Sequence, residues 1–363
     1  MQIERSIYNF QFTIFNLQFL VEEPVTAKLN LVTGATGLLG SHLVEALVRR
    51  GERVRALVRP TSGDLRDTAS LVRAVRGAEI VYHCAARVGD WAPRRVYQQE
   101  VIDATRQLLD VCSSEGVRRV LYVSSVTVYG HPGPESREQL TEESPLGQRL
   151  FWFWDRYCRS KIKAEAIARG HGTRATIVRP GWMYGPRDRN TLPRLILGLR
   201  SGRVMGLIGS GENLLNLIDA SDVAEGAILA AHHAEAGGQA YNLCSEGEFT
   251  QREFLDTVTD FLGLPRRTRH MPFRFALWSG LFSEIIGRAI FLKRPPHVTR
   301  YGVSLFGRPC QFSIAKARTQ LGWEPKVKGL DGVRRAIEWL QRQGVAGFAP
   351  ATRASKALAK LAE

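Results

Sequence analysis

The chain has 363 residues, of which 44% are hydrophobic and 23% are charged, the balance of a soluble globular protein that can bury a large core. Its net charge of +15 admits an anionic partner. The basic residues are scattered rather than gathered in a dense run, so we do not expect a nucleic-acid partner, and an anionic cofactor accounts better for the charge.

The cysteines and the apolar segments argue against metal-binding, secreted and membrane-spanning proteins. The five cysteines lie far apart and include no C-x-x-C pair, so we expect no metal site and free thiols in a reducing cytoplasm. Residues 1–27 lack a basic leader and a clean apolar run, and we interpret them as an N-terminal extension rather than a signal peptide. The sequence has no uncharged apolar stretch of about 18 residues, so no transmembrane span is expected.

Strands and helices are predicted to alternate through the first half of the chain. Apolar runs predict strands at residues 29–32, 53–58, 78–83, 119–123 and 175–178, and helical periodicity lies between them at residues 41–50, 96–112 and 151–168. This alternation is typical of an α/β fold with a doubly wound parallel sheet, the Rossmann arrangement. We expect that domain to span residues 28–180.

After residue 180 loops become more frequent. Helices are predicted at residues 222–232, 251–262 and 330–343, and we expect residues 181–345 to form a smaller lobe interleaved with the first domain and residues 346–363 to form a tail. Residues 273–292 are apolar but interrupted by two arginines and a glutamate. Packing in the core or the lobe is the favoured interpretation of this segment, with a substrate gate or a peripheral membrane contact as the alternative.

A glycine-rich turn, TGATGLLG, follows the first predicted strand and opens a helix. Glycines in such a turn let the backbone approach a pyrophosphate, which then lies at the positive end of the helix. The turn therefore predicts a dinucleotide site. Its residues expected to bind the cofactor are Gly34, Thr36, Gly37, Leu38, Leu39 and Gly40.

Tyr157 and Lys161 lie four residues apart in a predicted helix, so they share one of its faces. An ammonium beneath a phenol stabilises the phenolate and lowers the tyrosine pKa from about 10 toward neutrality. Such a tyrosine can exchange a proton with an alcohol or a ketone. Together with the glycine turn, the pair predicts a hydride-transfer site.

Five motifs make the chain resemble an extended short-chain dehydrogenase/reductase of the NAD-dependent epimerase/dehydratase superfamily, from about residue 29 to about residue 345. They are TGATGLLG, VYHCAA, VSSVTVYG, YCRSK and RPGWMYGPRD.

The resemblance implies roles for individual residues. Ser125, four places before the tyrosine of the VYG motif, would be the catalytic hydroxyl that binds the substrate oxygen. Tyr157 would be the acid–base, and Lys161 would lower its pKa and bind the nicotinamide ribose. Ala85, Ala86 and Pro180 would line the cofactor. Ser124 would pack in the core or bind backbone, and His83 would have a structural role.

The end of the second predicted strand bears on the choice of cofactor. Arg59 stands where an acidic residue would bind the ribose of NAD, so NADP(H) is favoured over NAD(H). Only residues 60–63 separate Arg59 from Asp64, too few for the usual third strand of the family, because a parallel crossover needs about a dozen residues. We expect a sheet without that strand, Asp64 and Leu65 still reaching the adenine, and a weakened but not abolished cofactor site.

The lobe residues indicate an apolar substrate. Trp182 stands where sugar-nucleotide members have an asparagine, and the C-terminal stretches are most similar to the 3β-hydroxysteroid and sterol dehydrogenase branch. We expect Trp182, Tyr184 and Asn213 to contact the substrate, and the aromatic residues 152–154 would suit a flat apolar ligand.

The sequence therefore predicts an NAD(P)-dependent oxidoreductase that interconverts a secondary alcohol and a ketone on a hydrophobic, steroid- or isoprenoid-like substrate. One alternative is a nucleotide-sugar epimerase or reductase. Another is a non-catalytic cofactor-binding relative, for which the missing strand and Val101, in place of an asparagine of the family, argue mildly. Family members often dimerise through the helix that bears the tyrosine, and a homodimer is left open.

Overall fold

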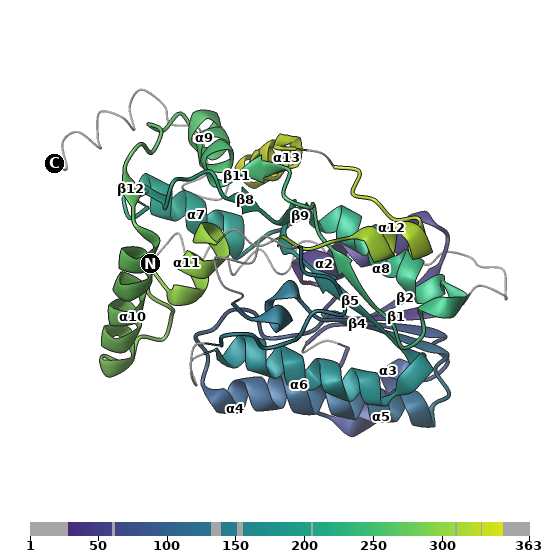
Figure 1. Cartoon of the computed structure of the whole chain (residues 1–363). Helices are drawn as coiled ribbons and strands as arrows, with labels where there is room; N and C mark the ends of the chain where they lie inside the picture. Colours follow the sequence, from purple (N-terminus) through teal and green to yellow (C-terminus); the bar gives the residue numbers. More distant parts are fainter. Residues whose placement is uncertain are drawn as a thin grey trace.

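A six-stranded parallel sheet forms the centre of the computed structural model (Figure 1), in the order β10-β5-β4-β3-β1-β2. Its strands alternate with helices along the chain, as predicted. Their bounds are β1 (Leu29–Thr33), β2 (Arg53–Leu57), β3 (Ile80–His83), β4 (Arg119–Val123), β5 (Ala175–Pro180) and β10 (Ala240–Leu243). The doubly wound Rossmann fold is confirmed.

The structure describes residues 28–59, 62–131, 139–150, 155–204, 206–308, 311–327 and 329–343. The expected extension at residues 1–27, the tail at 346–363 and the aromatic residues 152–154 lie outside this range.

Apolar side chains fill both faces of the sheet, because successive residues of a strand point to opposite sides. In β4, Leu121 belongs to the core on one face and Val120 to the core on the other, and in β5 Val178 and Ile177 divide in the same way.

The helices form a layer on each face (Figure 1). One layer holds α3 (Thr68–Val75), α4 (Arg94–Tyr97), α5 (Ala104–Ser114) and α6 (Arg156–Gly170). The other holds α2 (Leu38–Arg49), α8 (Ala220–His232) and α12 (Ala315–Leu321).

Among the residues that the structure describes, no strand takes the place of the usual third strand of the family, as expected from the short segment after Arg59. β2 pairs with β1 and ends the sheet, and its residues are more exposed than those of β1. The chain then enters α3, which Asp67 caps by accepting hydrogen bonds from the backbone N–H groups of Ala69 and Ser70. In the described part of the chain, no strand pairs with the outer edge of β2, so that edge of the sheet is open there.

Several predicted helices differ in their bounds. The helix predicted at residues 151–168 is α6, which begins at Arg156, after its N-cap Asp155, and continues to Gly170. The predicted helix at residues 41–50 begins earlier, at Leu38, because the extended Gly37 is its N-cap. The predicted helix at residues 96–112 is divided by a π-helical segment (Gln98–Asp103) between α4 and α5. A periodicity of 3.6 does not reveal one wider turn, so the sequence indicated a single helix.

A smaller lobe follows β5, and β10 returns from it to complete the sheet. Its helices are α7 (Thr191–Arg200), α9 (Gln251–Phe261), α10 (Phe273–Ala289), α11 (Arg300–Gly307) and α13 (Asp331–Arg342). Its short strand pairs are β6 (Trp182–Tyr184) with β9 (Leu217–Asp219), β8 (Leu214–Leu215) with β11 (Phe249–Thr250), and β7 (Leu207–Ile208) with β12 (His270–Met271). A third core forms between α7, α9 and α13.

Candidate active site

The glycine turn joins β1 to α2 at the carboxyl edge of the sheet. Gly34 has a φ of 66°, in the left-handed region that favours glycine, and a Cβ there would lie 2.8 Å from the Ala85 backbone. A Cβ on Gly40 would lie 2.2 Å from the Gly34 carbonyl oxygen. These two positions admit only hydrogen at Cα, so the turn and the strand beyond it stay close together.

The start of α2 is suited to an anion. Its N-cap, Gly37, is exposed, and no described side chain caps the helix. The first N–H groups of a helix have no partner within it, and they carry the positive end of its dipole. A pyrophosphate group therefore fits the residues of this turn.

The other predicted cofactor-binding residues of this region lie around the turn. Thr36 and Leu38 are partly exposed, whereas Leu39 is buried in the core. Ala85 lies against Gly34, and its backbone N–H donates to the Thr33 hydroxyl at 3.3 Å. Ala86, next along the chain, is partly exposed, and the buried Pro180 ends β5 at the carboxyl edge.

His83 is structural, as expected. Its ring nitrogens lie 2.9 Å from the Thr33 hydroxyl and 3.1 Å from the Thr105 hydroxyl. Burial, together with the charge of Lys161, lowers the pKa of His83 to about 3. The ring is therefore neutral near neutral pH and ties β3 to its neighbours.

Ser125 and Tyr157 meet in the structure although they lie far apart in the sequence. Ser125 caps a short 3₁₀ helix (Val126–Tyr129) by accepting from the Thr127 backbone N–H at 3.3 Å. Tyr157, in the first turn of α6, is buried, and its hydroxyl lies near the Ser125 side chain. Burial raises the pKa of Tyr157 to about 12, and the nearby Ser125 hydroxyl opposes this rise. The phenol therefore holds its proton at neutral pH.

Lys161 lies one turn after Tyr157 and is also buried. Its ammonium donates to the Val123 carbonyl at 2.8 Å and lies 5.2 Å from the centre of the Tyr122 ring. Burial lowers the pKa of Lys161 to about 8. The expected lowering of the tyrosine pKa is not found, because the end of β4 holds the ammonium and desolvation dominates at the phenol.

A buried ion pair lies further along α6. Glu165 accepts hydrogen bonds from Arg179 Nη2 and from Ser124 Oγ, each at 2.6 Å. Ser124 was expected to pack or to bind backbone, but its partner is this carboxylate. Arg179 also donates to the Tyr129 hydroxyl at 2.7 Å. The network joins β4, α6 and β5 directly beside Ser125.

Sequence reasoning missed two residues that contact Tyr157. Asp90, in the loop after β3, accepts from the Tyr157 backbone N–H at 2.9 Å. Burial raises the pKa of Asp90 to about 7, and the charges of Asp155 and Glu284 add to the rise. Tyr301, in α11, meets the Tyr157 ring edge to face with centroids 6.3 Å apart. Since both contacts are distant in sequence, no local spacing indicates them.

The predicted adenine-binding residues lie beyond the end of β2. The guanidinium of Arg59 is half exposed and lies 3.9 Å from the Glu100 carboxylate. Asp64 pairs with Arg66 at 2.6 Å, which lowers the pKa of Asp64, and Leu65 packs at the edge of the core below the sheet. Their roles in binding adenine stay predictions.

The predicted substrate-binding residues belong to the lobe. Trp182 packs edge to face on Phe306, with ring centroids 4.5 Å apart. Tyr184 is buried in the lobe core, and the Asn213 amide donates to the Phe306 carbonyl at 2.6 Å and accepts from Gln251 at 2.9 Å. Core packing explains the position of Tyr184, and hydrogen bonds within the protein explain that of Asn213. The expected contacts of Trp182, Tyr184 and Asn213 with the substrate stay predictions.

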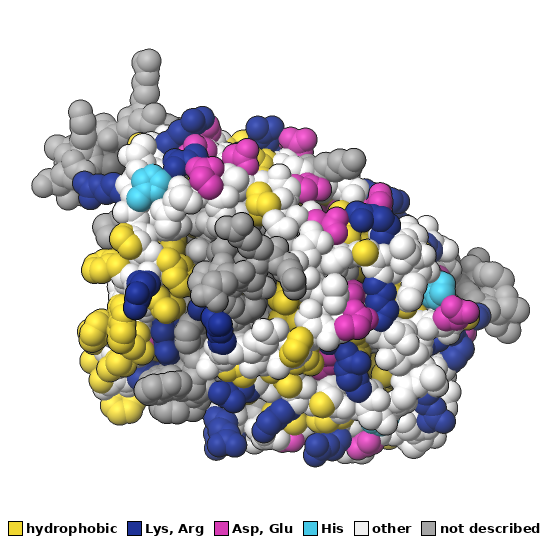
Figure 2. All heavy atoms as spheres, in the orientation of Figure 1, with side chains coloured by type: hydrophobic (Ala, Val, Ile, Leu, Met, Phe, Trp, Pro, Cys, Tyr) yellow, Lys and Arg dark blue, Asp and Glu magenta, His cyan; other side chains and the backbone are white. Residues whose placement is uncertain are grey.

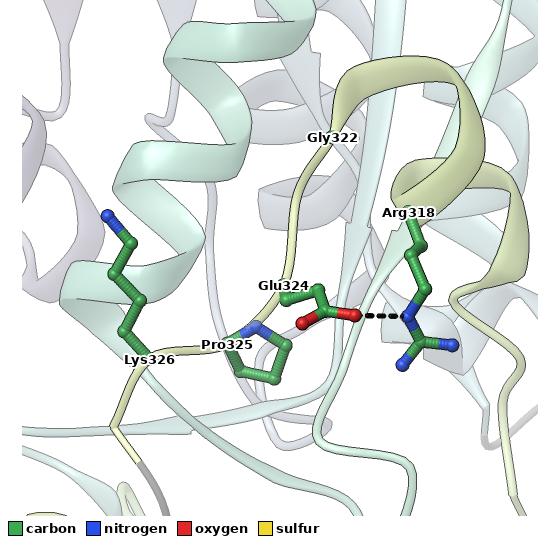
Figure 3. Close-up of a pocket in the computed structure, with 5 residues that line it drawn as sticks. All are labelled: Arg318, Gly322, Glu324, Pro325 and Lys326. Atoms are coloured by element: carbon green, nitrogen blue, oxygen red, sulfur yellow. Dashed lines mark hydrogen bonds and ion pairs between the residues drawn. The ribbon is translucent and has the colours of Figure 1, made fainter.

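A separate surface hollow lies at the end of α12 (Figure 3). It is lined by Arg318, Gly322, Glu324, Pro325 and Lys326. Arg318 Nε donates to Glu324 Oε1 at 2.6 Å, and Lys326 points away from this pair. The hollow shares no residue with the site around Tyr157.

The chain is similar to a protein family and to several of its members over most of its length. The model of the NAD dependent epimerase/dehydratase family matches residues 30–244. A 2-alkyl-3-oxoalkanoate reductase of Stenotrophomonas maltophilia is 30% identical over 84% of this chain and 97% of its own. A 4-hydroxy-2-methyl-3-oxo-4-farnesyl-3,4-dihydroquinoline-1-oxide ketoreductase of Stigmatella aurantiaca is 30% identical over 84% and 95%. The decarboxylating sterol-4-alpha-carboxylate 3-dehydrogenase of Mus musculus is 27% identical over 86% and 91%.

A solved structure of a related protein is similar to this chain over most of its length. MoeE5 in complex with UDP-glucose and NAD has a TM-score of 0.67 and 25% identity, and the match covers 86% of this chain and 98% of that one. The matched region holds the glycine turn and the residues around Tyr157. The chain belongs to the NAD dependent epimerase/dehydratase family, the extended short-chain dehydrogenases/reductases, and is an NAD-dependent oxidoreductase of that family with sterol 3-dehydrogenases among its relatives.

Proposed function

We propose that the protein interconverts a ketone and a secondary alcohol on a large apolar substrate, with NADP(H) as the favoured cofactor. The observation that carries the proposal is the proximity of the Ser125 side chain to the buried Tyr157 hydroxyl, at the carboxyl edge of the sheet where β1 enters the glycine turn. In open α/β sheets, ligands bind at this edge.

The nicotinamide supplies the hydride when bound. Tyr157 holds a proton that it can donate to the substrate oxygen as negative charge develops there, since burial keeps the phenol protonated. Ser125 can donate a second hydrogen bond to the same oxygen. In the opposite direction both groups act in reverse, and Tyr157 accepts the proton of the alcohol.

Lys161 has a different role in this proposal. Its pKa of about 8 leaves it mostly charged at neutral pH, and its ammonium is fixed at the end of β4 by the Val123 carbonyl. From that place it would bind the ribose next to the nicotinamide, as the resemblance implied. It then positions the cofactor and adds positive charge near the phenol.

The preference for NADP(H) rests on Arg59. Its side chain is half exposed just after β2, where a guanidinium can pair with a ribose 2′-phosphate. The ion pair with Glu100 is long, at 3.9 Å, so a phosphate can compete for the guanidinium. The open edge at β2 leaves a thinner wall for the adenine, and we expect moderate rather than tight cofactor affinity.

Two observations support an apolar substrate. Trp182, Phe306 and Phe254 form an aromatic cluster in the lobe. The reductase, the ketoreductase and the sterol dehydrogenase among the relatives are named for alkyl, farnesyl and sterol substrates. We infer a substrate with a carbonyl or hydroxyl carbon on a large apolar body.

A substrate panel read by NADPH absorbance tests this function. It should contain 2-alkyl-3-oxo acids, sterol ketones, aryl ketones and sugar nucleotides. We expect turnover of apolar ketones, and we expect Tyr157→Phe to lose it while still binding NADPH in a fluorescence titration. Turnover of sugar nucleotides alone, or full activity in Tyr157→Phe, would overturn the proposal. Failure of the parent protein to bind NADPH at millimolar concentration would favour the non-catalytic alternative.

A further inference from the structure

Helix α10 turns its large apolar side chains toward solvent. Figure 2 shows hydrophobic side chains gathered at the edge of the molecule where Figure 1 places α10. Those of the helix lie three or four residues apart, except for the adjacent Ile285 and Ile286, so they share one broad face. The exposed set, continued by the turn after the helix, is Phe275, Trp278, Phe282, Ile285, Ile286, Ile290, Phe291 and Leu292. We call it the α10 face.

The opposite side of α10 is built from small residues. Ala276, Gly280 and Gly287 are buried there. A Cβ on Gly280 would lie 2.9 Å from the Arg300 backbone nitrogen, and one on Gly287 would lie 3.2 Å from the Trp91 ring. A larger side chain on the inner side would clash, so the helix cannot rotate to bury its large residues. The outward orientation of the α10 face is therefore fixed by the sequence.

The charges around the α10 face are positive. Arg274 stands at the start of the helix, and Lys293 and Arg294 follow its end, all with exposed side chains. Glu284 is the one acidic residue between residues 273 and 298, and it is buried in an ion pair with Arg300 at 2.7 Å. An apolar face with cations at both ends complements a surface that is apolar below and anionic above.

We propose that the α10 face docks onto an anionic lipid bilayer, with the helix lying in the plane of the interface. Its length fits this position, because α10 has 17 residues and a helix that crosses a bilayer needs about 20. No helix in the described part of the chain is long and apolar enough to cross a membrane. Aromatic and isoleucine side chains would enter the acyl boundary, while the flanking arginine and lysine side chains reach the headgroups.

The α10 face lies close to the catalytic residues. Arg300, which binds Glu284 of α10, precedes Tyr301, whose ring meets that of Tyr157. On the other side, Trp91 Nε1 donates to the Leu292 carbonyl at 2.9 Å, and Trp91 adjoins Asp90 in the loop that contacts α6. A bilayer under this face would bring dissolved apolar substrates to the site. This last step rests on the proposed function, whereas the docking itself does not.

Vesicle sedimentation with the full chain tests the docking. The parent protein is mixed with vesicles of phosphatidylcholine alone or with added phosphatidylserine, at low and high salt. We expect binding to the anionic vesicles that weakens as salt rises. The double variant Phe282→Glu/Ile286→Glu should bind at least about ten-fold more weakly. Leu229→Glu is the matched control, because Leu229 is an exposed leucine on α8.

Thermal melting and turnover of a water-soluble ketone accompany the vesicle assay. Parental melting and turnover in the double variant, with lost vesicle binding, would support docking as a separate property of the α10 face. Vesicle binding by the parent would stand even if no ketone were turned over, so failure of the proposed function is distinguishable.

Four results would overturn the proposal. The first is no binding of the parent to anionic vesicles, and the second is equal binding to vesicles with and without phosphatidylserine. The third is a dimer that the double variant dissociates while vesicles are not bound, which would assign the face to a second copy of the chain. The fourth is vesicle binding that appears only after residues 1–27 are deleted, which would assign the face to that segment.

Discussion

Replacing Glu165 with glutamine removes the charge that balances a buried arginine beside the active site. The side chains of Arg179 and Glu165 are 1% and 0% exposed, and two of their hydrogen bonds join them, at 2.6 and 3.2 Å. Removing one partner of a buried pair leaves a charge without solvent or counter-ion, which costs about 3–5 kcal/mol. The remaining ion pair of this glutamate, with the partly exposed Arg169, adds little by comparison.

This cost translates into a shift of the melting temperature. The unfolding entropy of a chain of this length is about 0.7 kcal/mol per kelvin, so the loss corresponds to roughly 4–7 °C. Differential scanning calorimetry of the parent and Glu165→Gln measures the shift. Asp260→Asn is the control, because Asp260 pairs with Arg266 at 2.6 Å where the two side chains are 49% and 60% exposed, and we expect no measurable change there.

The pH dependence gives a second readout. Burial alone would raise the pKa of Glu165, but hydrogen bonds and charge from Arg179, with Ser124 and Arg169, hold it below the ordinary value of 4.5. Its stabilisation is therefore fully present above about pH 4.5 and is lost as the pH falls through the lowered pKa. The parent and the variant should converge in acid. A variant that melts within 1 °C of the parent at pH 7 would refute the reasoning.

Three further variants test separate parts of the structure. Gly40→Ala places a Cβ 2.2 Å from the Gly34 carbonyl oxygen and should lower the free energy of unfolding by about 1–3 kcal/mol. It should also weaken NADPH binding in a fluorescence titration, and unchanged affinity would contradict the role of the glycine turn in holding the cofactor. Asp90→Asn removes a carboxyl whose pKa is raised to about 7 by burial, with Asp155 and Glu284 adding to it. The protonated carboxyl stabilises the parent below about pH 4, and this stabilisation is lost by about pH 7. The melting temperature of Asp90→Asn relative to that of the parent should therefore rise as the pH increases across this window. A difference in melting temperature that does not change with pH would contradict this reasoning. Arg59→Ala should weaken NADPH binding by at least about ten-fold and leave NADH binding nearly unchanged, and equal losses for both cofactors would remove Arg59 from the phosphate site.

Local patterns were enough to predict the glycine turn and the shared face of Tyr157 and Lys161. The missing strand could also be predicted, because four residues after Arg59 cannot form a crossover. These inferences depend on chain geometry over a few residues. They do not require knowledge of which distant segments meet.

The remaining features of the site depend on contacts between distant segments. Lys161 was expected to act on the tyrosine pKa, but its ammonium binds the Val123 carbonyl, 38 residues away. Asp90 and Tyr301 reach Tyr157 from a loop and from the lobe. Burial, which dominates the pKa of Tyr157, is a property of the assembled core and cannot be read from spacing.

Deuterium transfer from the reduced cofactor tests the central claim most directly. Reduced cofactor carrying deuterium at both C4 positions of the nicotinamide is incubated with an apolar ketone, and the alcohol is analysed by mass spectrometry. The account predicts one deuterium on the carbon that bears the new hydroxyl, and a rate at least about 100-fold lower in Tyr157→Phe. An alcohol without the label, or parental turnover in Tyr157→Phe, would contradict it.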